Sequence, residues 1–140
     1  MEAELQEYYN KAKDAEACQE ALEVIRKAGT IEKLLKDENI GEYLYWYIGN
    51  IMAYKRWPEA EPIIMKDAMY ACLYAENVLG HRWREAEPHI MKDPYWSDYY
   101  AVYVMDMRWP EAEPIIKNSD SANDYCQYFD ITREEMNSGS

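Results

Sequence analysis

The chain contains the stretch Arg56-Trp57-Pro58-Glu59-Ala60-Glu61-Pro62-Ile63-Ile64-Met65-Lys66-Asp67. The same pattern returns from Arg82 to Asp93 and a third time from Arg108, at intervals of 26 residues. A tandem repeat of this length is typical of one supersecondary unit that buries its apolar face against its own copies. We therefore predict an all-α, helical-repeat stack of short-plus-long helix pairs.

The order of residues within a copy predicts where its two helices lie. Pro58 suits the first position of a helical turn, and Pro62 cannot donate a hydrogen bond to the Pro58 carbonyl, so the copy should begin as a tight or 3₁₀-like turn. A short helix at about 62–65, a break at 66–67 and a longer helix at about 69–79 should follow. Gly80 should end the longer helix.

The N-terminal segment predicts a long capping helix. Apolar and small residues recur at three- and four-residue steps over 2–28, which is the pattern of an amphipathic helix. Gly29 should cap it, and Thr30 should begin a short helix that runs to residue 37. Another, aromatic helix is predicted over 42–54.

We expect a single domain over residues 1–137. Its parts are the N-terminal helix and cap (1–29), a degenerate repeat (30–55) and three repeats (56–81, 82–107 and 108–133). A last helix at about 122–129 and the polar tail should close the stack, since terminal repeats are commonly altered into polar caps. Residues 138–140 are treated as a candidate appended tail.

The layout resembles the leucine-rich variant repeat and, more loosely, HEAT-type solenoids. The string RWPEAEP, followed by an Ile, a Lys-Asp and a Tyr/Ala-rich helix, is also similar to short tandem repeats of phages and other mobile elements. That similarity covers about residues 43–117, and Arg84 replaces the proline in the middle copy. It implies a bacterial or phage setting and no particular activity.

Charge and composition restrict the kind of partner. The chain has 27 acidic and 15 basic residues, a net charge of −12 and 49% hydrophobic residues that include 14 Tyr and 5 Trp. A folded protein is expected, because this much apolar area can be buried. Direct binding to nucleic acid is disfavoured, since that affinity comes from Lys and Arg. A charged partner should therefore present a basic surface.

The three cysteines, Cys18, Cys72 and Cys126, form no CxxC pair and predict buried thiols in a reducing compartment. The acidic N-terminus has no apolar core segment, and no run of 18 apolar residues is present. We expect a cytoplasmic protein, located in the host cytoplasm if it is encoded by a phage, and no membrane association. The oligomeric state does not follow from the sequence.

The repeat places equivalent residues in columns. The first columns are Arg56, Arg82 and Arg108, and Trp57, Trp83 and Trp109. We predict that they are structural: each Trp should wedge between layers, and each Arg should bond to a neighbouring helix C-terminus or carboxylate. The alternative is an exposed Trp/Arg ridge that anchors an interface.

Carboxylates form the next columns, with Asp67 and Asp93 at the junctions that follow. Glu59, Glu85 and Glu111 make one row, and Glu61, Glu87 and Glu113 make another. One interpretation is capping, because glutamate in a first helical turn favours the helix dipole. The other is that two rows of spaced negative charge mimic nucleic acid phosphates and bind a basic channel.

Enzyme chemistry is not expected. His81 and His89 have no matching Cys or His for a zinc site, and the Glu-Ala-Glu pairs lack the oxygen-rich loop that Ca²⁺ or Mg²⁺ needs. The sequence contains no GxSxG, HExxH or glycine-rich phosphate loop. We predict no catalytic residue, no metal and no cofactor.

Two functions remain as hypotheses. The first is a non-enzymatic acidic inhibitor of the anti-CRISPR or anti-restriction type, which blocks the nucleic-acid site of a host defence nuclease. The second is a general helical-repeat interaction scaffold with a tyrosine-rich binding face. That face would comprise Tyr43, Tyr47, Tyr70, Tyr95, Tyr99 and Tyr103.

Overall fold

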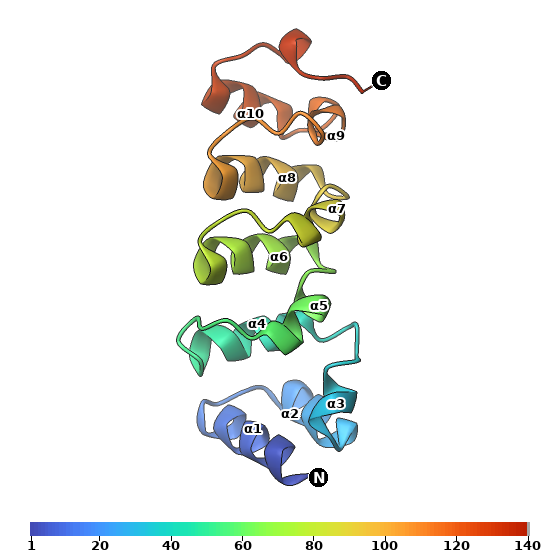
Figure 1. Ribbon diagram of the computed structural model, residues 1–140, viewed down its shortest axis with the longest axis vertical. Helices are drawn as coiled ribbons and strands as arrows, with labels where there is room; N and C mark the ends of the chain where they lie inside the picture. The colour runs from blue at the N-terminus through green and yellow to red at the C-terminus, as the bar shows by residue number, and fades with distance from the viewer. Residues whose placement is uncertain (140) are drawn as a thin grey trace. The chain divides into compact units, whose positions relative to one another are not determined.

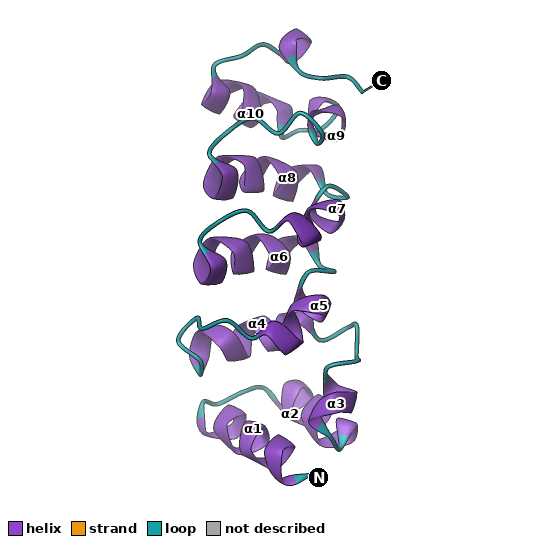
Figure 2. Cartoon of the chain, viewed as in Figure 1, coloured by secondary structure: helices purple, strands orange, loops and turns teal. Residues whose placement is uncertain are grey.

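The computed structural model describes residues 1–139, and within them every regular element is helical and none is a strand (Figures 1 and 2). The chain forms two compact units, which we describe separately. The first spans Met1–Ile64 and the second starts at Met65. The boundary falls inside the repeat 56–81. No helix formed by the described residues is long and apolar enough to cross a membrane.

The first unit contains five α-helices and one 3₁₀ turn. These are α1 (Ala3–Asp14), α2 (Gln19–Ala28), α3 (Ile31–Leu34), α4 (Gly41–Asn50), η1 (Pro58–Ala60) and α5 (Glu61–Ile64). Helix α2 packs against α1 and α3, and α4 packs against α5. Leu5 of α1 and Ile48 of α4 are completely buried in its core.

The prediction of one helix over 2–28 is wrong, because the chain breaks after Asp14. Glu16 has a φ of 64°, and the backbone N–H of Ala15 bonds to the Lys11 carbonyl where α1 ends. The break lets α1 and α2 pack side by side. The sequence hides it because Ala15 and Cys18 continue the three-residue apolar step across the turn.

The boundaries of the next elements are partly as predicted. Gly29 ends α2 with a φ of 78°, and the Thr30 side chain accepts a hydrogen bond from the Lys33 N–H at the start of α3. The helix predicted over 42–54 is shorter, since α4 ends at Asn50. Tyr54 lies beyond it with a φ of 60°, in the left-handed region that no helix interior uses.

The second unit contains alternating short and long helical segments. These are α6 (Ala68–Tyr74) with the π-helical turn η2 (Ala75–Leu79), the 3₁₀ turn η3 (Arg84–Ala86), α7 (Glu87–Ile90), α8 (Pro94–Tyr100) with the π-helical turn η4 (Ala101–Met105), α9 (Glu113–Lys117), α10 (Ala122–Phe129) and the 3₁₀ turn η5 (Arg133–Glu135). Helix α6 packs against α7 and α8, and α8 packs against α9 and α10. The short-plus-long layout predicted for a copy is confirmed in this unit.

The first two long segments, α6 with η2 and α8 with η4, begin and end in the same way. The Asp93 carboxylate accepts the Trp96 N–H at the start of α8, and Asp67 does the same for Met69 at the start of α6. Gly80 ends the first long segment in the left-handed conformation, as predicted, and Asp106 ends the second. The π-helical turns were not predicted, because residue spacing does not separate an i→i+5 turn from an α-helix.

Candidate functional site

Each copy of the repeat contains an arginine bound to the second glutamate of the same copy. Both Nε and an Nη of Arg82 donate to the Glu87 carboxylate, at 2.9 and 2.7 Å. The same two-pronged pair joins Arg108 to Glu113 at 2.9 Å and Arg56 to Glu61 at 3.0 Å. The prediction that these arginines bond to a carboxylate is confirmed, and the carboxylate belongs to their own copy.

In the second unit a tyrosine completes this arrangement. The Tyr100 hydroxyl donates to Glu87 at 2.7 Å and accepts the backbone N–H of Trp83 at 2.7 Å. Tyr125 makes the same two bonds in the next copy, to Glu113 and from Trp109. We call each set of Arg, Trp, Glu and Tyr a clasp. The two clasps are Arg82, Trp83, Glu87 and Tyr100, and Arg108, Trp109, Glu113 and Tyr125.

The clasps keep their carboxylates ionised inside the protein. Burial raises the pKa of Glu87, but the hydrogen bonds from Arg82 and Tyr100 outweigh it and leave the pKa below its usual value. The pKa of Glu113 is lowered in the same way. Burial and the neighbouring carboxylate raise the pKa of the Tyr100 hydroxyl, so it remains a donor.

The chain that follows α10 covers the second clasp. The Asn137 N–H donates to Glu113 at 2.7 Å, and the Arg108 guanidinium also donates to the Glu135 carbonyl at 3.1 Å. Glu113 is 0% exposed as a result. Ser138, which belongs to the candidate appended tail, accepts a hydrogen bond from Lys117 at 2.8 Å.

The two predicted rows of carboxylates therefore differ in accessibility. Glu59, Glu85 and Glu111 are exposed, whereas Glu61, Glu87 and Glu113 are buried. The second row is not a surface row, because its carboxylates are bound to the arginines of their own copies. Of the junction residues, Asp67 is exposed and Asp93 is half-buried, and both cap helices.

The tryptophan column is internal, as the structural interpretation predicts. Trp57, Trp83 and Trp109 are all buried. The Trp83 ring lies 5.0 Å from Tyr74, and the Trp109 ring lies 5.0 Å from Tyr100, at interplanar angles of 38° and 42°. The exposed Trp/Arg ridge is therefore not formed.

Four aromatic rings, two of them exposed and two half-buried, gather instead along α8 and η4. Consecutive contacts join Tyr95 to Trp96, Trp96 to Tyr99, and Tyr99 to Tyr103, with ring centroids 4.9, 5.1 and 4.5 Å apart. We call these four residues the aromatic ladder. Tyr95 is 58% and Tyr103 62% exposed. Sequence reasoning selected its three tyrosines but missed Trp96, which follows Tyr95 and precedes Tyr99 by three residues.

The other tyrosines of the predicted face lie elsewhere. Tyr47 is buried in the first unit, and Tyr43 and Tyr70 are half-buried. Tyr47 is therefore not part of an exposed face.

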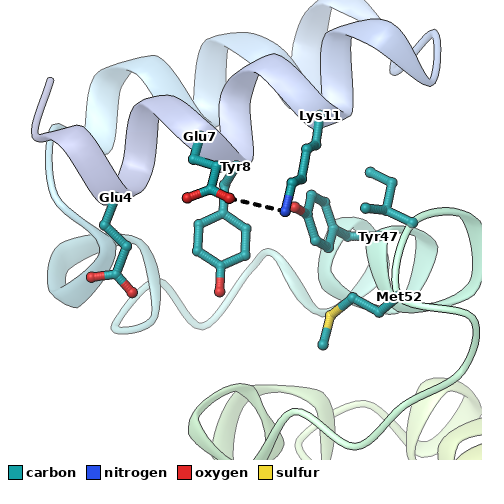
Figure 3. A pocket seen from close by; sticks show the side chains of 7 residues that line it. Glu4, Glu7, Tyr8, Lys11, Tyr47 and Met52 are labelled. Carbon is teal, nitrogen blue, oxygen red and sulfur yellow. Dashed lines mark ion pairs between the residues drawn. The ribbon is translucent and has the colours of Figure 1, made fainter.

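The first unit has an open pocket that the sequence did not predict. Its lining residues are Glu4, Glu7, Tyr8, Lys11, Tyr47, Ile51 and Met52 (Figure 3). Lys11 pairs with Glu7 at 3.1 Å. Helix α1 supplies the charged side chains and Tyr8, and α4 with the turn after it supplies the remainder, so about 40 residues of chain separate the two walls.

A pair of aspartates lies between α8 and α10. Asp98 is 5% exposed, and its Oδ1 has no hydrogen-bond partner within residues 1–139. Burial and the nearby Asp124 raise the pKa of Asp98 to about 8. The two aspartates are 26 residues apart, but we did not predict a pair, because the first copy has Cys72 at that position.

The possible metal ligands do not gather within the described residues, and the three cysteines differ in exposure. Among the described residues no group of three or more His, Cys, Asp or Glu side chains could hold a metal ion. Cys72 is buried and Cys126 half-buried, but Cys18 is exposed, so the prediction of three buried thiols is wrong at Cys18. Cys18 lies in the turn between α1 and α2, where its side chain is exposed. The prediction placed it inside one continuous helix.

Comparison with protein-family models, with curated proteins and with solved structures finds no match to the chain.

Proposed function

We propose that the protein is a non-enzymatic, acidic protein-binding inhibitor that blocks the nucleic-acid site of a host defence nuclease, in the manner of phage anti-CRISPR or anti-restriction proteins. The observation that carries this proposal is the exposed row Glu59, Glu85 and Glu111, repeated every 26 residues on a chain of net charge −12. Such an inhibitor acts in the host cytoplasm, on a partner with a basic surface.

We further propose that the copies form a helical-repeat stack. The support is local: the arginine–glutamate pair recurs in three copies, and the tyrosine that completes it recurs in two. A stack would give the exposed glutamates a regular spacing, which is what mimicry of a phosphate backbone requires. Of the two glutamates in each Glu-Ala-Glu segment, only the first is then presented, with Asp67 as an addition.

The test is competition with nucleic acid. The protein is titrated into CRISPR and restriction nucleases bound to fluorescent DNA or RNA, and displacement is followed by anisotropy. We expect the triple variant Glu59→Lys, Glu85→Lys and Glu111→Lys to lose competition while it stays folded. Unchanged competition by that variant would contradict the proposal.

A matched control separates position from total charge. The variant Glu16→Lys, Asp120→Lys and Glu134→Lys changes three exposed acids outside the row and alters the net charge equally. It should retain most of the competition. Equal loss of competition in both variants would indicate that competition depends on the total negative charge and not on the row.

The aromatic ladder favours a second candidate function, a general interaction scaffold. The ladder consists of four rings in contact, and two of its tyrosines are strongly exposed. Tyr and Trp are enriched in protein interfaces. Salt distinguishes the two candidates. An electrostatic mimic should lose affinity steeply as ionic strength rises, whereas binding through the ladder should change little.

A further inference from the structure

The pocket of the first unit has the size of a single side chain. Its volume is about 270 Å³, below the range of pockets that enclose drug-sized molecules. The pocket is open to solvent, and Figure 3 shows the side chains that line it. The occupant must therefore be small or must be one residue of a larger partner.

Two tyrosine rings form its aromatic wall. Tyr8 and Tyr47 lie with ring centroids 5.3 Å apart and planes inclined by 54°. Trp57 stacks on one side of Tyr8 at 5.1 Å and 9°, and contacts Tyr47 at 5.6 Å. Trp57 does not line the pocket, and its contacts with both rings restrict their movement.

The charges at the pocket favour a cation. Glu4 and Glu7 line it. Burial raises the pKa of the Tyr8 hydroxyl, and the carboxylates of Glu4, Glu59 and Glu7 raise it further, so Glu59 also lies near this ring. Lys11 supplies the one positive charge among the lining residues. Three carboxylates thus outnumber one ammonium around two tyrosine rings.

Lys11 shows that the pocket can accommodate a cationic side chain. Its ammonium lies 3.1 Å from Glu7, and in Figure 3 it extends toward Tyr47. Both members of the pair are more than half exposed, so the pair is easily exchanged for another. A cation from outside could replace Lys11 beside Glu7.

We propose that this pocket binds the guanidinium group of an arginine on a protein partner, which displaces Lys11 from Glu7. A guanidinium is planar, is weakly hydrated, stacks on aromatic rings and donates two parallel hydrogen bonds to a carboxylate. The tyrosine rings offer a stacking surface, and the two carboxylates of α1 offer hydrogen-bond acceptors of opposite charge. The proposal rests on the proposed function for the source of the arginine, since a basic partner presents such residues.

The experiment uses a small probe and needs no identified partner. Nα-acetyl-arginine amide is titrated into the full-length protein, and the ring signals of Tyr8 and Tyr47 are followed by NMR. Nα-acetyl-citrulline amide, which has the same shape without the charge, is the matched control. We expect saturable shifts with the arginine probe and none with the citrulline probe.

Variants of exposed residues test the roles of the charges without disturbing the core. Glu4→Gln with Glu7→Gln should weaken binding of the arginine probe about fivefold, and Lys11→Met should strengthen it about threefold. Glu16→Gln, an exposed change outside the pocket, should have no effect. Equal shifts with citrulline, or binding unchanged in the double Gln variant, would overturn the proposal.

The outcome is separable from that of the competition assay. Arginine-selective shifts without displacement of nucleic acid would support the pocket and contradict the inhibitor function. Displacement of nucleic acid without any shift from the arginine probe would overturn the pocket and leave the inhibitor function intact.

Discussion

At the scale of single residues, the carboxylates of the clasps should contribute strongly to stability. Glu87 is buried and accepts two bonds from Arg82 and one from Tyr100. Glu87→Gln should lower the free energy of unfolding by about 2–3 kcal/mol, because it leaves a partly buried guanidinium without its counter-charge. Urea denaturation measures this change.

The neighbouring exposed glutamate provides the control. Glu85→Gln should change the free energy of unfolding by less than about 0.5 kcal/mol. Similar losses in the two variants would show that the clasp is not a stabilising unit. A pH series adds a second readout: because the pKa of Glu87 is lowered on folding, its contribution is complete above about pH 4.3 and is lost as the pH falls through the folded value.

Asp98 should have the opposite dependence on pH. Its pKa rises on folding to about 8, so it is protonated in the folded protein over a range in which the unfolded chain has already ionised it. Stability should therefore fall as the pH rises from about 4 to 8. Asp98→Asn should abolish this fall and stabilise the protein at pH 8 by about 1–3 kcal/mol, with little change at pH 4.

Thermal unfolding of the two proteins across this pH range tests the prediction. Asp124→Asn is the companion variant, since it removes the second charge while it keeps a polar partner for Asp98. If the stability of the wild type is flat between pH 4 and 8, the buried aspartate does not titrate as inferred.

At the scale of elements, the long segments share a left-handed C-terminal residue. Gly80 ends η2, Asp106 ends η4 and Asp130 ends α10, with φ values of 72°, 50° and 54°. Gly80→Ala should cost about 1 kcal/mol, because an L side chain is strained at this φ. Nothing obstructs the new methyl group, so the cost is conformational.

The reciprocal substitution checks the explanation. Asp130→Gly should leave stability unchanged or raise it by up to about 1 kcal/mol, since glycine relieves the same strain. Asp106 is less suitable, because its carboxylate accepts a hydrogen bond from Tyr128 at 2.7 Å. A destabilised Asp130→Gly variant would show that the aspartate contributes more than its conformation.

At the scale of the whole molecule, the exposed glutamate row should tolerate mutation, whereas the buried row should not. Glu59→Lys, Glu85→Lys and Glu111→Lys together halve the net charge of −12 but change only exposed side chains. The melting temperature should shift by no more than a few degrees. Glu61→Gln, Glu87→Gln and Glu113→Gln together should abolish folding, because three buried pairs are broken at once.

Circular dichroism of the two triple variants distinguishes these outcomes. A folded Gln triple variant would mean that the buried row is dispensable. An unfolded Lys triple variant would mean that the exposed row has a structural role. That variant could not then be used in the competition assay.

Much of the secondary structure was predictable from the sequence because its signals are local. The Pro58 turn, the break at Asp67, the Gly80 stop and the Gly29 and Thr30 caps each depend on the conformational limits of a residue or on a hydrogen bond within one helical turn. The 26-residue period likewise identified which arginines, tryptophans and glutamates are equivalent. Which residues are equivalent could therefore be predicted without any knowledge of packing.

Accessibility was not predictable, because it depends on which side chains the fold brings together. Glu59 and Glu61 are two residues apart and chemically identical, yet one is exposed and the other is buried against Arg56. The Tyr8–Tyr47 pocket, the Asp98–Asp124 pair and the tyrosines of the clasps join residues 12 to 39 positions apart. Local patterns carry the repeat and its turns, whereas contacts between distant segments set the burial, pairing and pKa of the carboxylates.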